Sequence, residues 1–556
     1  MLNRRLVMSA AAVVTASIAL IPGTAQAADP VKPAAQAVST PAVDLKKAAA
    51  AAFQPATSPA GRTVRQAAPA ARSGAAAAPQ SADTAQDVTI GLTAEGTSGR
   101  GLELTFDITS PDARLDVEIL WGDGYKDSAA SYGSSTTVRP HLYTEVGVYE
   151  VEVVVTDHDT NAKYANSVTF ATWGSEFTPY GPTRLLDTRN GTGAVRAPAR
   201  PYSSTRLKVG GNGGIPADAT AVALNVTVTN SSAAGHVTVF PAGTDRPTTS
   251  NVNYEARQTV PNLVIVPVGE DGYVELYNGG WESVDLLADV TGYFSNKASS
   301  GYVPLNPVRA VDTRAGLGAA KAPVAGQSSF DVKISGANSI PYGLKAVALN
   351  VTVTAPKEAG HLTVYPTGQA APSTSNVNFT AGQTVANSVI VPVGPDGRIS
   401  IRNGAWNTTE VVVDVVGYYT PESWNTFVPV LPERLLDTRS ADWGLGPLPG
   451  REYLPLPVSP DVVGITGYAL NTTVTNTRGD GFLSVAPDPN TAAQYDNRTA
   501  VVPPRPVSSA LNWTRGRTVP NLVQASAGDT GIVDFWNQGW DDADVIVDIF
   551  GYYDNK

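Results

Sequence analysis

A short motif of one acidic and one basic residue recurs three times in the chain. The tripeptide Asp-Thr-Arg stands at 187–189, 312–314 and 437–439, so the interval between copies is 125 residues. An arginine guanidinium binds a carboxylate through two parallel hydrogen bonds, which suits an internal ion pair or an anionic ligand. We expect ion pairs, because each repeat ends in an aspartate among branched residues, where an unpaired carboxylate is costly. The predicted pairs are Arg189 with Asp289, Arg314 with Asp414, and Arg439 with Asp548.

The alternative for these arginines is a site for an anionic ligand, with the glycines behind each motif as its loop. Gly191 and Gly193 follow the first copy, and Gly316 and Gly318 follow the second. In the third copy the corresponding loop is stretched to residues 440–446.

The histidines and carboxylates form no recognisable catalytic or metal-binding motif. His236 and His361 occupy equivalent positions in two repeats, and the third copy has Phe482 there. No Gly-x-Ser-x-Gly, His-Glu-x-x-His or phosphate-binding glycine loop is present, and no second histidine lies at metal-ligand spacing. A solvent-facing strand histidine is therefore expected. A glycoside hydrolase, which needs only two carboxylates, stays as an alternative, but we predict a protein that is not an enzyme and uses no cofactor.

Three tryptophans, each behind an Asn-led turn, are the candidate ligand-binding residues. They are Trp281, Trp406 and Trp540. A tryptophan at a hairpin tip can lie under a sugar ring, and three sites on one chain would raise a weak affinity by avidity. The competing interpretation is a ring that folds back and covers the sheet. The partner expected from these residues is a polysaccharide or cell-wall polymer, or else a surface protein.

The elements that position these residues are repeats long enough to form complete domains. We place the repeats at 176–297, 300–421 and 425–556, and we expect each to fold alone. In 222–229 branched residues alternate with Ala, Asn and Thr, which predicts a strand with one core face and one polar face. Asn225, Asn350 and Asn471 in these strands also read as glycosylation sequons, but we interpret them as structural.

Turn chemistry indicates that the repeats are all-β. Glu270-Asp271-Gly272 and Asn278-Gly279 each follow a strand-like run, and glycine supplies the positive φ of a hairpin turn. About eight strands per repeat predict a β-sandwich or jelly roll. Residues 178–556 resemble tandem repeats of secreted actinobacterial proteins, with a Leu-Leu-Asp-Thr-Arg opening and an Asp-Val-Val-Gly-Tyr-Phe close. That resemblance implies no activity.

The third repeat departs from the other two by an insertion around residues 488–507, which contains Pro503, Pro504 and Pro506. It is predicted to be a surface loop, because prolines and a variable length are tolerated there. A loop that sets specificity for the partner is the alternative.

Residues 87–174 form a separate unit of period-two strands. Leu120-Trp121-Gly122-Asp123-Gly124, then His141-Leu142-Tyr143, then Gly147-Val148-Tyr149, resemble the PKD domain over about 88–172. The resemblance implies an extracellular, non-catalytic β-sandwich that contacts proteins or polysaccharides or acts as a spacer. This unit departs from the commonest form of the motif by a shorter Trp-to-Asp spacing.

Trp121 and Asp123 mark the turn of this unit. We expect Trp121 in the sandwich core and Asp123 in a tight bend between two glycines, where its carboxylate accepts backbone N–H groups. A calcium site made of Asp123, Asp157 and Asp159 is the alternative, since carboxylates in loops suit a hard cation.

The N-terminal residues look like an export signal and a spacer. Residues 1–27 hold Arg4 and Arg5, an apolar run and Ala25-Gln26-Ala27, which predicts a cleaved signal peptide. The arginine pair also permits a twin-arginine signal. Residues 28–86 are rich in Ala, Pro, Gln and Ser and predict a disordered linker, in which 42–53 could form a transient helix.

Charge and composition exclude several classes of partner. The formal net charge is −11, which argues against nucleic acid, because phosphate binding needs a basic face. The chain has no cysteine, so it forms no disulfide, and beyond the signal no stretch is long and apolar enough to insert into a membrane. We therefore expect a secreted, extracellular and cell-wall-associated modular protein that binds polysaccharide or protein. A purely structural surface-layer or spacer array is the second interpretation.

Overall fold

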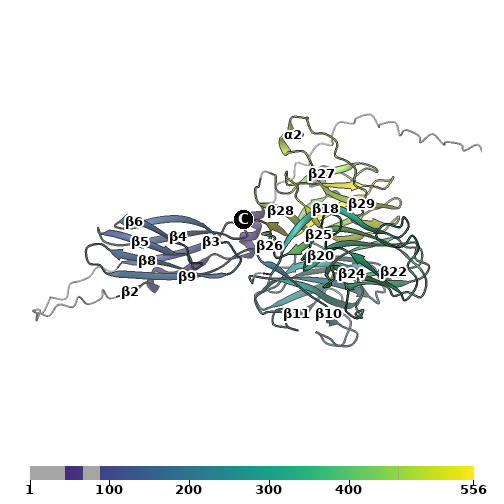
Figure 1. Cartoon of the computed structure of the whole chain (residues 1–556), viewed down its shortest axis with the longest axis horizontal. Helices are drawn as coiled ribbons and strands as arrows, with labels where there is room; N and C mark the ends of the chain where they lie inside the picture. Colours follow the sequence, from purple (N-terminus) through teal and green to yellow (C-terminus); the bar gives the residue numbers. More distant parts are fainter. Residues whose placement is uncertain (1–43, 67–87, 298, 461) are drawn as a thin grey trace, which may run out of the picture.

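The chain folds into a slender β-sandwich that is joined at one end to a larger β-body, as Figure 1 shows. The computed structural model describes residues 44–66 and 88–556, apart from residues 298 and 461. Nearly every described element is a strand, so the all-β prediction is confirmed. Among the described residues, no helix is long and apolar enough to cross a membrane. The predicted signal, residues 1–27, lies outside the described residues.

The slender unit is a two-sheet sandwich. Its strands are β1 (Ala56–Ser58), β2 (Val64–Gln66), β3 (Thr89–Gly96), β4 (Gly101–Thr109), β5 (Arg114–Leu120), β6 (Lys126–Tyr132), β7 (Ser135–Leu142), β8 (Val148–Asp157) and β9 (Lys163–Ala171). One sheet has the order β1-β3-β4-β7 and the other β2-β9-β8-β5-β6. Alternate residues of β3, β4 and β5 are buried, which is the period-two pattern of a sandwich.

The turn of this sandwich has the predicted form. Trp121 is 1% exposed and belongs to the sandwich core. Gly122 and Gly124 have φ of 86° and 94°, and Asp123 Oδ1 accepts the Tyr125 N–H at 3.0 Å. The other carboxylate oxygen of Asp123 lies 2.8 Å from His141 Nε2, and the His141 ring stacks on Trp121. The tight bend is thus built by two glycines and by hydrogen bonds to one carboxylate.

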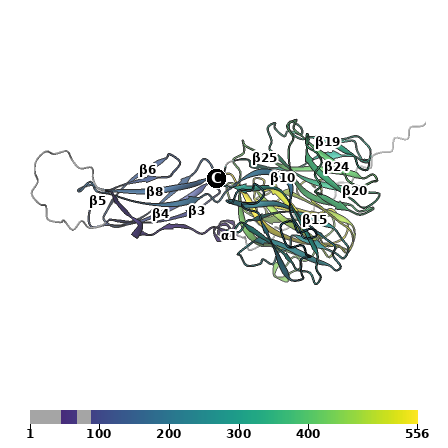
Figure 2. The ribbon, with the colours of Figure 1, turned by 90° about the horizontal axis from the view of Figure 1, so that it is seen from below.

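Part of the predicted linker is a folded strap. Residues 44–66 form α1 (Leu45–Ala52), β1, η1 (Ala60–Arg62) and β2. Strands β1 and β2 pair with β3 and β9, and α1 lies where the sandwich meets the body in Figure 2. The disorder prediction is therefore wrong for residues 44–66, because their few apolar side chains find a core supplied by other domains. Residues 28–43 and 67–86 lie outside the described residues.

The three repeats share one topology. The first consists of β10 (Glu176–Asp187), β11 (Ser203–Lys208), β12 (Ala219–Thr229), β13 (Gly235–Pro241), β14 (Val252–Tyr254), β15 (Val260–Pro267), β16 (Tyr273–Asn278) and β17 (Asp285–Ser295). The second consists of β18 (Gly301–Asp312), β19 (Ser329–Lys333), β20 (Ala346–Thr354), β21 (Gly360–Pro366), β22 (Val377–Phe379), β23 (Val385–Pro392), β24 (Arg398–Asn403) and β25 (Glu410–Thr420).

The third repeat adds two short helices to the same set of strands. It consists of β26 (Thr426–Asp437), η2 (Ala441–Trp443), β27 (Tyr453–Pro457), β28 (Ile465–Thr475), β29 (Gly481–Pro487), α2 (Ala492–Asp496), β30 (Leu511–Trp513), β31 (Val519–Ser526), β32 (Ile532–Asn537) and β33 (Asp544–Asp554). Within each repeat, counted from its first described strand, the sheets have the orders 1-8-3-6 and 2-7-4-5. This is the strand order of a jelly roll, as the turn pattern predicted.

The repeats do not stand apart but pack around a common centre. In β12, Val222 and Leu224 face the core of their own jelly roll, whereas Ala221 and Ala223 face a central core shared by all three repeats. That central core contains Phe177, Ala221, Ala223, Leu263, Ile265, Phe294, Tyr302, Ala346, Ala348, Ile390, Tyr419, Phe427, Ala469, Leu522 and Tyr553. The polar face predicted for this strand is therefore an interface between domains and is not exposed to solvent.

The three sequon asparagines belong to this interface. Asn225, Asn350 and Asn471 are all buried, so the structural interpretation is supported by their position. Each donates to a backbone carbonyl of another repeat, with partners Ser375, Ser509 and Ser250 respectively. The first repeat bonds to the second, the second to the third and the third to the first. The array closes into a ring about a pseudo-threefold axis.

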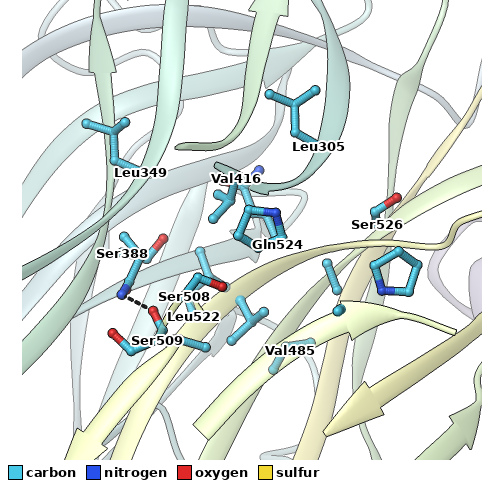
Figure 3. A pocket seen from close by; sticks show the side chains of 17 residues that line it. Leu305, Leu349, Ser388, Val416, Val485, Ser508, Ser509, Leu522, Gln524 and Ser526 are labelled. Carbon is cyan, nitrogen blue, oxygen red and sulfur yellow. Dashed lines mark hydrogen bonds between the residues drawn. The ribbon is translucent and has the colours of Figure 1, made fainter. Parts of the chain in front are cut away.

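A small cavity lies inside the boundary between the second and third repeats. It encloses about 30 Å³, and Leu305, Val485 and Gln524 are among its lining residues in Figure 3. A space of this size holds one or two waters. Within the described ranges Gln524 Oε1 is buried without a hydrogen-bond partner, and the cavity is too small for an organic ligand.

Candidate binding face

The candidate residues of all three repeats gather at one end of the ring. Strand β12 pairs with β15 from Ala221 opposite Pro267 to Val228 opposite Val260. Pro267 lines a recess together with Phe53 and Trp173, which lie next to the slender sandwich. The end of β12 and β15 that contains Pro267 therefore faces the slender sandwich and is called the docked end. The opposite end, with Val260, is called the free end below. The loop that carries Trp281 leads into β17, whose Asp285 pairs with Thr229 at the free end.

The three tryptophans project from the free end. Trp281, Trp406 and Trp540 are 78%, 82% and 82% exposed. The structure therefore does not fold these rings back over the sheet. Their loops are held by the preceding asparagine: Asn278 Nδ2 donates to the carbonyls of Ala199, Arg200 and Glu282. Asn403 and Asn537 make the corresponding bonds in the other repeats, so each exposed ring stands on a fixed turn.

Each tryptophan has a different neighbour at one equivalent turn position. Tyr202 packs edge to face on Trp281, with 5.4 Å between ring centroids. The Arg451 guanidinium lies 5.1 Å from the Trp540 ring centroid. Gln327, which takes this position in the second repeat, donates to the Gly404 carbonyl beside Trp406. The three sites thus share a ring and a scaffold but offer different polar groups beside it.

The closing aspartates pair with a different arginine from the one predicted. Asp289 is bound by Arg184, through Nε at 2.7 Å and Nη2 at 3.0 Å, and not by Arg189. Arg189 instead donates two hydrogen bonds to Asp187, the aspartate of its own motif. They run from Nε to Oδ1 at 2.9 Å and from Nη2 to Oδ2 at 2.7 Å. The same exchange occurs in the other repeats: Arg309 binds Asp414 and Arg434 binds Asp548, whereas Arg314 and Arg439 bind Asp312 and Asp437.

A β-bulge explains the exchange. Arg184 stands directly opposite Asp289, and the register then shifts between Arg184 and Leu186. The extra residue breaks the alternation of sides on which the predicted pairing rested. The strand also ends at Asp187, so Arg189 lies in the following turn and cannot reach along the sheet. The sequence did hold a signal, because Arg184, Arg309 and Arg434 recur at the same 125-residue interval.

Burial dominates the electrostatics of the closing aspartates. The pKa of Asp289 is raised by its removal from water, and the Arg184 guanidinium offsets part of this. The pKa of Asp548 rises to about 6 for the same reason. The pKa of Asp187 is lowered, and the largest cause is the hydrogen bond from the Arg189 side chain. These arginines are thus engaged by carboxylates of the protein, which leaves the anionic-ligand alternative without support from their geometry.

The remaining titratable candidates show no catalytic arrangement. His236 is half-buried against Gly279 rather than facing solvent, and burial lowers the pKa of its ring. Asp157 Oδ1 accepts the backbone N–H of Asp159 and of Thr160, while Asp123 pairs with His141. Across the described ranges, no group of three or more acidic or histidine side chains is placed to hold a metal ion.

Comparisons with known proteins give no family. No protein-family model matches the chain, and no curated protein matches it. Among solved structures, the chain is similar to carbohydrate-binding modules of the β-sandwich superfamily at 11% identity and a TM-score of 0.16, over 60% of this chain and 98% of the other. The tandem CBM22 modules of Xyn10C from Paenibacillus barcinonensis match at 10% identity and a TM-score of 0.15, over 44% and 100%.

A third similar structure is the triple jelly roll of an archaeal virus turret assembly. It matches at 10% identity and a TM-score of 0.14, over 74% of this chain and 89% of the other. Likenesses at this level carry no inference about function.

Proposed function

We propose that the chain is a non-catalytic binding protein whose free end holds a polysaccharide through the three exposed tryptophans. The observation that carries this proposal is the equivalent exposure of Trp281, Trp406 and Trp540 on fixed turns at one end of a closed ring. Exposed aromatic rings on rigid supports stack on sugar rings with little loss of side-chain freedom. Three such sites in a fixed relation raise the affinity for a long polymer by roughly 10²–10⁴ over one site.

The geometry of the carboxylates favours binding over hydrolysis. A glycoside hydrolase needs two carboxyl groups that reach the scissile bond from opposite sides. Asp289 is 2% exposed and bound by Arg184, and its equivalents are bound in the same way. Asp488 and Asp534 lie together in the third repeat, but they are 2% and 0% exposed beneath the insertion. Neither arrangement offers a substrate two accessible carboxyl groups.

Binding is tested by removal of the three rings. The variant with Trp281, Trp406 and Trp540 all changed to Ala is expected to lose retention on insoluble cell-wall polysaccharide and signals on a glycan array. Its melting temperature should match the parent's, because surface rings contribute within about 0.5 kcal/mol. Trp424→Ala is the matched control, since this ring is 60% exposed near the docked end, over Arg100. Equal retention of the triple variant and the parent would contradict the proposal.

A second candidate is a structural role, in which the ring and the sandwich serve only as a rigid spacer. It is favoured by the docking of the sandwich on the ring, where Arg100 N–H donates to the Lys556 carbonyl at 2.8 Å. A parent protein that binds no glycan and no cell-wall fraction, yet assembles on the cell surface, would support it. Export is part of both proposals, and a mature N-terminus near Ala28 in culture supernatant would test it.

A further inference from the structure

A cavity opens at the free end where the three repeats meet. It encloses about 860 Å³, which falls in the range of small-molecule sites, roughly 300–1,000 Å³. Most residues of one equivalent segment in each repeat line it, within 253–261, 378–386 and 512–520, and the start of β21 completes the wall. Strand β22, one of the lining elements, lies at the end of the body away from the slender sandwich in Figure 1. The cavity is therefore on the pseudo-threefold axis, at the end that carries the tryptophans.

The cavity wall is rich in groups that bind hydroxyls. Amides and hydroxyls come from all three repeats, and they include Gln258, Thr259, Gln383, Thr384, Thr514 and Thr518. His361 also lines the wall, and burial, followed by the charge of Arg402, lowers the pKa of its ring, so it is neutral near pH 7. Neutral donors and acceptors on several sides suit a ligand with many hydroxyl groups.

The charges of the wall favour one negative group on that ligand. Arg517 of the third repeat forms an ion pair with Glu255 of the first, which neutralises both. Arg257 is exposed, and within the described part of the chain it forms no ion pair. A guanidinium in this position can bind a carboxylate or a phosphate through two hydrogen bonds.

Arg257 also occupies a position where the other repeats have glycine. Its φ is 62°, and Gly382 and Gly516 adopt 73° and 76° at the equivalent turns. A left-handed conformation strains a residue that carries a side chain, whereas glycine adopts it freely. The turn therefore does not need an arginine, and the positive charge at this place is an addition to the shared scaffold.

We propose that the axial cavity binds an anionic unit of the polysaccharide, with its acidic group on Arg257 and its hydroxyls on the amides and threonines of the wall. This proposal rests on the proposed function and deepens it, because it names the chemical class of the polymer. The acidic group is a carboxylate, as in a uronic acid, or a phosphate diester, as in a polyol-phosphate chain. The tryptophans then bind neighbouring sugar units where the polymer extends from the cavity over the free end.

Calorimetric titration of the full mature chain tests the proposal with three probes: trigalacturonic acid, its carboxyl-reduced neutral counterpart, and an oligomer of glycerol phosphate. The parent is expected to bind at least one anionic probe about tenfold or more tightly than the neutral one, with an affinity that falls as salt rises. The preferred anionic probe identifies the source of the acidic group. Equal affinity for neutral and anionic probes, or no binding of either anionic probe, overturns the proposal.

Arg257→Gly is the decisive variant, because the other repeats show that glycine fits this turn. It should lose at least about tenfold in affinity for the preferred anionic probe, with a melting temperature no lower than the parent's. Arg257→Lys, which keeps the charge, should recover part of the loss. Unchanged anionic binding in Arg257→Gly overturns the proposal. The triple tryptophan variant separates the two ideas: if it binds long polymer like the parent while Arg257→Gly does not, the tryptophan function fails and the cavity stands.

Discussion

Asn387 donates its side-chain amide to Asn225 Oδ1 at 3.0 Å, across the boundary between the second and first repeats. The same bond joins Asn521 to Asn350 at 3.0 Å and Asn262 to Asn471 at 3.1 Å. Each of these six asparagines is buried, and each pair lies beside the central aromatic core. Three equivalent contacts that close on themselves join the three repeats into one body, although each has a jelly-roll core of its own.

An isolated repeat is therefore not expected to remain a monomer. A fragment of residues 300–421 exposes the face that holds Ala346, Ala348 and Ile390, together with the rings of Tyr302 and Tyr419. Because that face is complementary to the next repeat in the ring, the fragment should associate into trimers or aggregate. Light scattering after size exclusion measures the mass of the fragment, with the full chain run for comparison. A stable monomer with one cooperative melt would support the expectation that each repeat folds alone.

The arginine that stabilises each closing aspartate can be identified by two matched substitutions. Arg309→Met leaves the buried Asp414 unpaired and removes the bond to the Val507 carbonyl of the third repeat, so it should cost about 3–5 kcal/mol. Arg314→Met should cost about 1 kcal/mol, because the side chain of Arg314 is 52% exposed. Urea unfolding of both variants gives the comparison.

The double variant Arg309→Met with Asp414→Leu provides the control, since it removes both charges from the buried site. It should recover much of the stability lost by Arg309→Met alone. A larger loss for Arg314→Met than for Arg309→Met would contradict the pairing seen in the structure.

Local patterns predicted the strands and turns well, and long-range relationships poorly. The strand predicted over 222–229 and the glycine bend around Asp123 depend on neighbours in the sequence, and both are present. The ring was missed because Ala223, Asn225 and Thr227 look like a solvent-facing row, although all three are buried against other repeats. In a sequence, small and amide side chains look the same whether they lie at a domain interface or on a solvent-exposed surface. The arginine partners were missed because a bulge is not visible in the alternation.

The strap at the N-terminal side should control how firmly the slender sandwich is held. Leu45 and Ala49 of α1 are 4% and 0% exposed and belong to the core of the third repeat, while β1 and β2 extend the sheets of the sandwich. Changing Leu45 and Ala49 to Glu should release α1, because two charges cannot be buried there. Hydrogen exchange should then show loss of protection in α1, and X-ray scattering should show a wider range of domain orientations.

The control for the strap is Lys47→Glu, which places one of the same charges on the exposed side of the helix. This variant should keep the parent's protection pattern and scattering curve. Equal protection of α1 in the double variant and in Lys47→Glu would show that the helix is not held by its apolar side.

The insertion of the third repeat encloses a pair of carboxyl groups. Asp488 Oδ1 accepts the backbone and side-chain N–H groups of Asn490 at 2.6 and 2.8 Å, and its Oδ2 accepts the hydroxyl of Tyr495 from α2. Asp534 of β32 is fully buried beside it. Removal from water, followed by the neighbouring Asp488, raises the pKa of Asp534 to about 10. Because of this raised pKa, Asp534 carries a proton near neutral pH.

This arrangement makes the stability of the protein depend on pH in a predictable direction. The pKa of Asp534 is 3.8 in the ordinary state and about 10 in the fold, so between these values the folded chain carries a proton that the unfolded chain does not. The stability that this proton contributes to the fold is fully present below pH 4. It is lost as pH rises toward 10, at up to about 1.4 kcal/mol of unfolding free energy per pH unit. Asp534→Asn replaces the carboxyl group by an amide of similar shape that does not titrate. The variant should therefore lose less melting temperature than the parent between pH 6 and pH 9 in calorimetry. Asp529→Asn, at an exposed position, should follow the parent, and parallel curves for Asp534→Asn and the parent would contradict the raised pKa of Asp534.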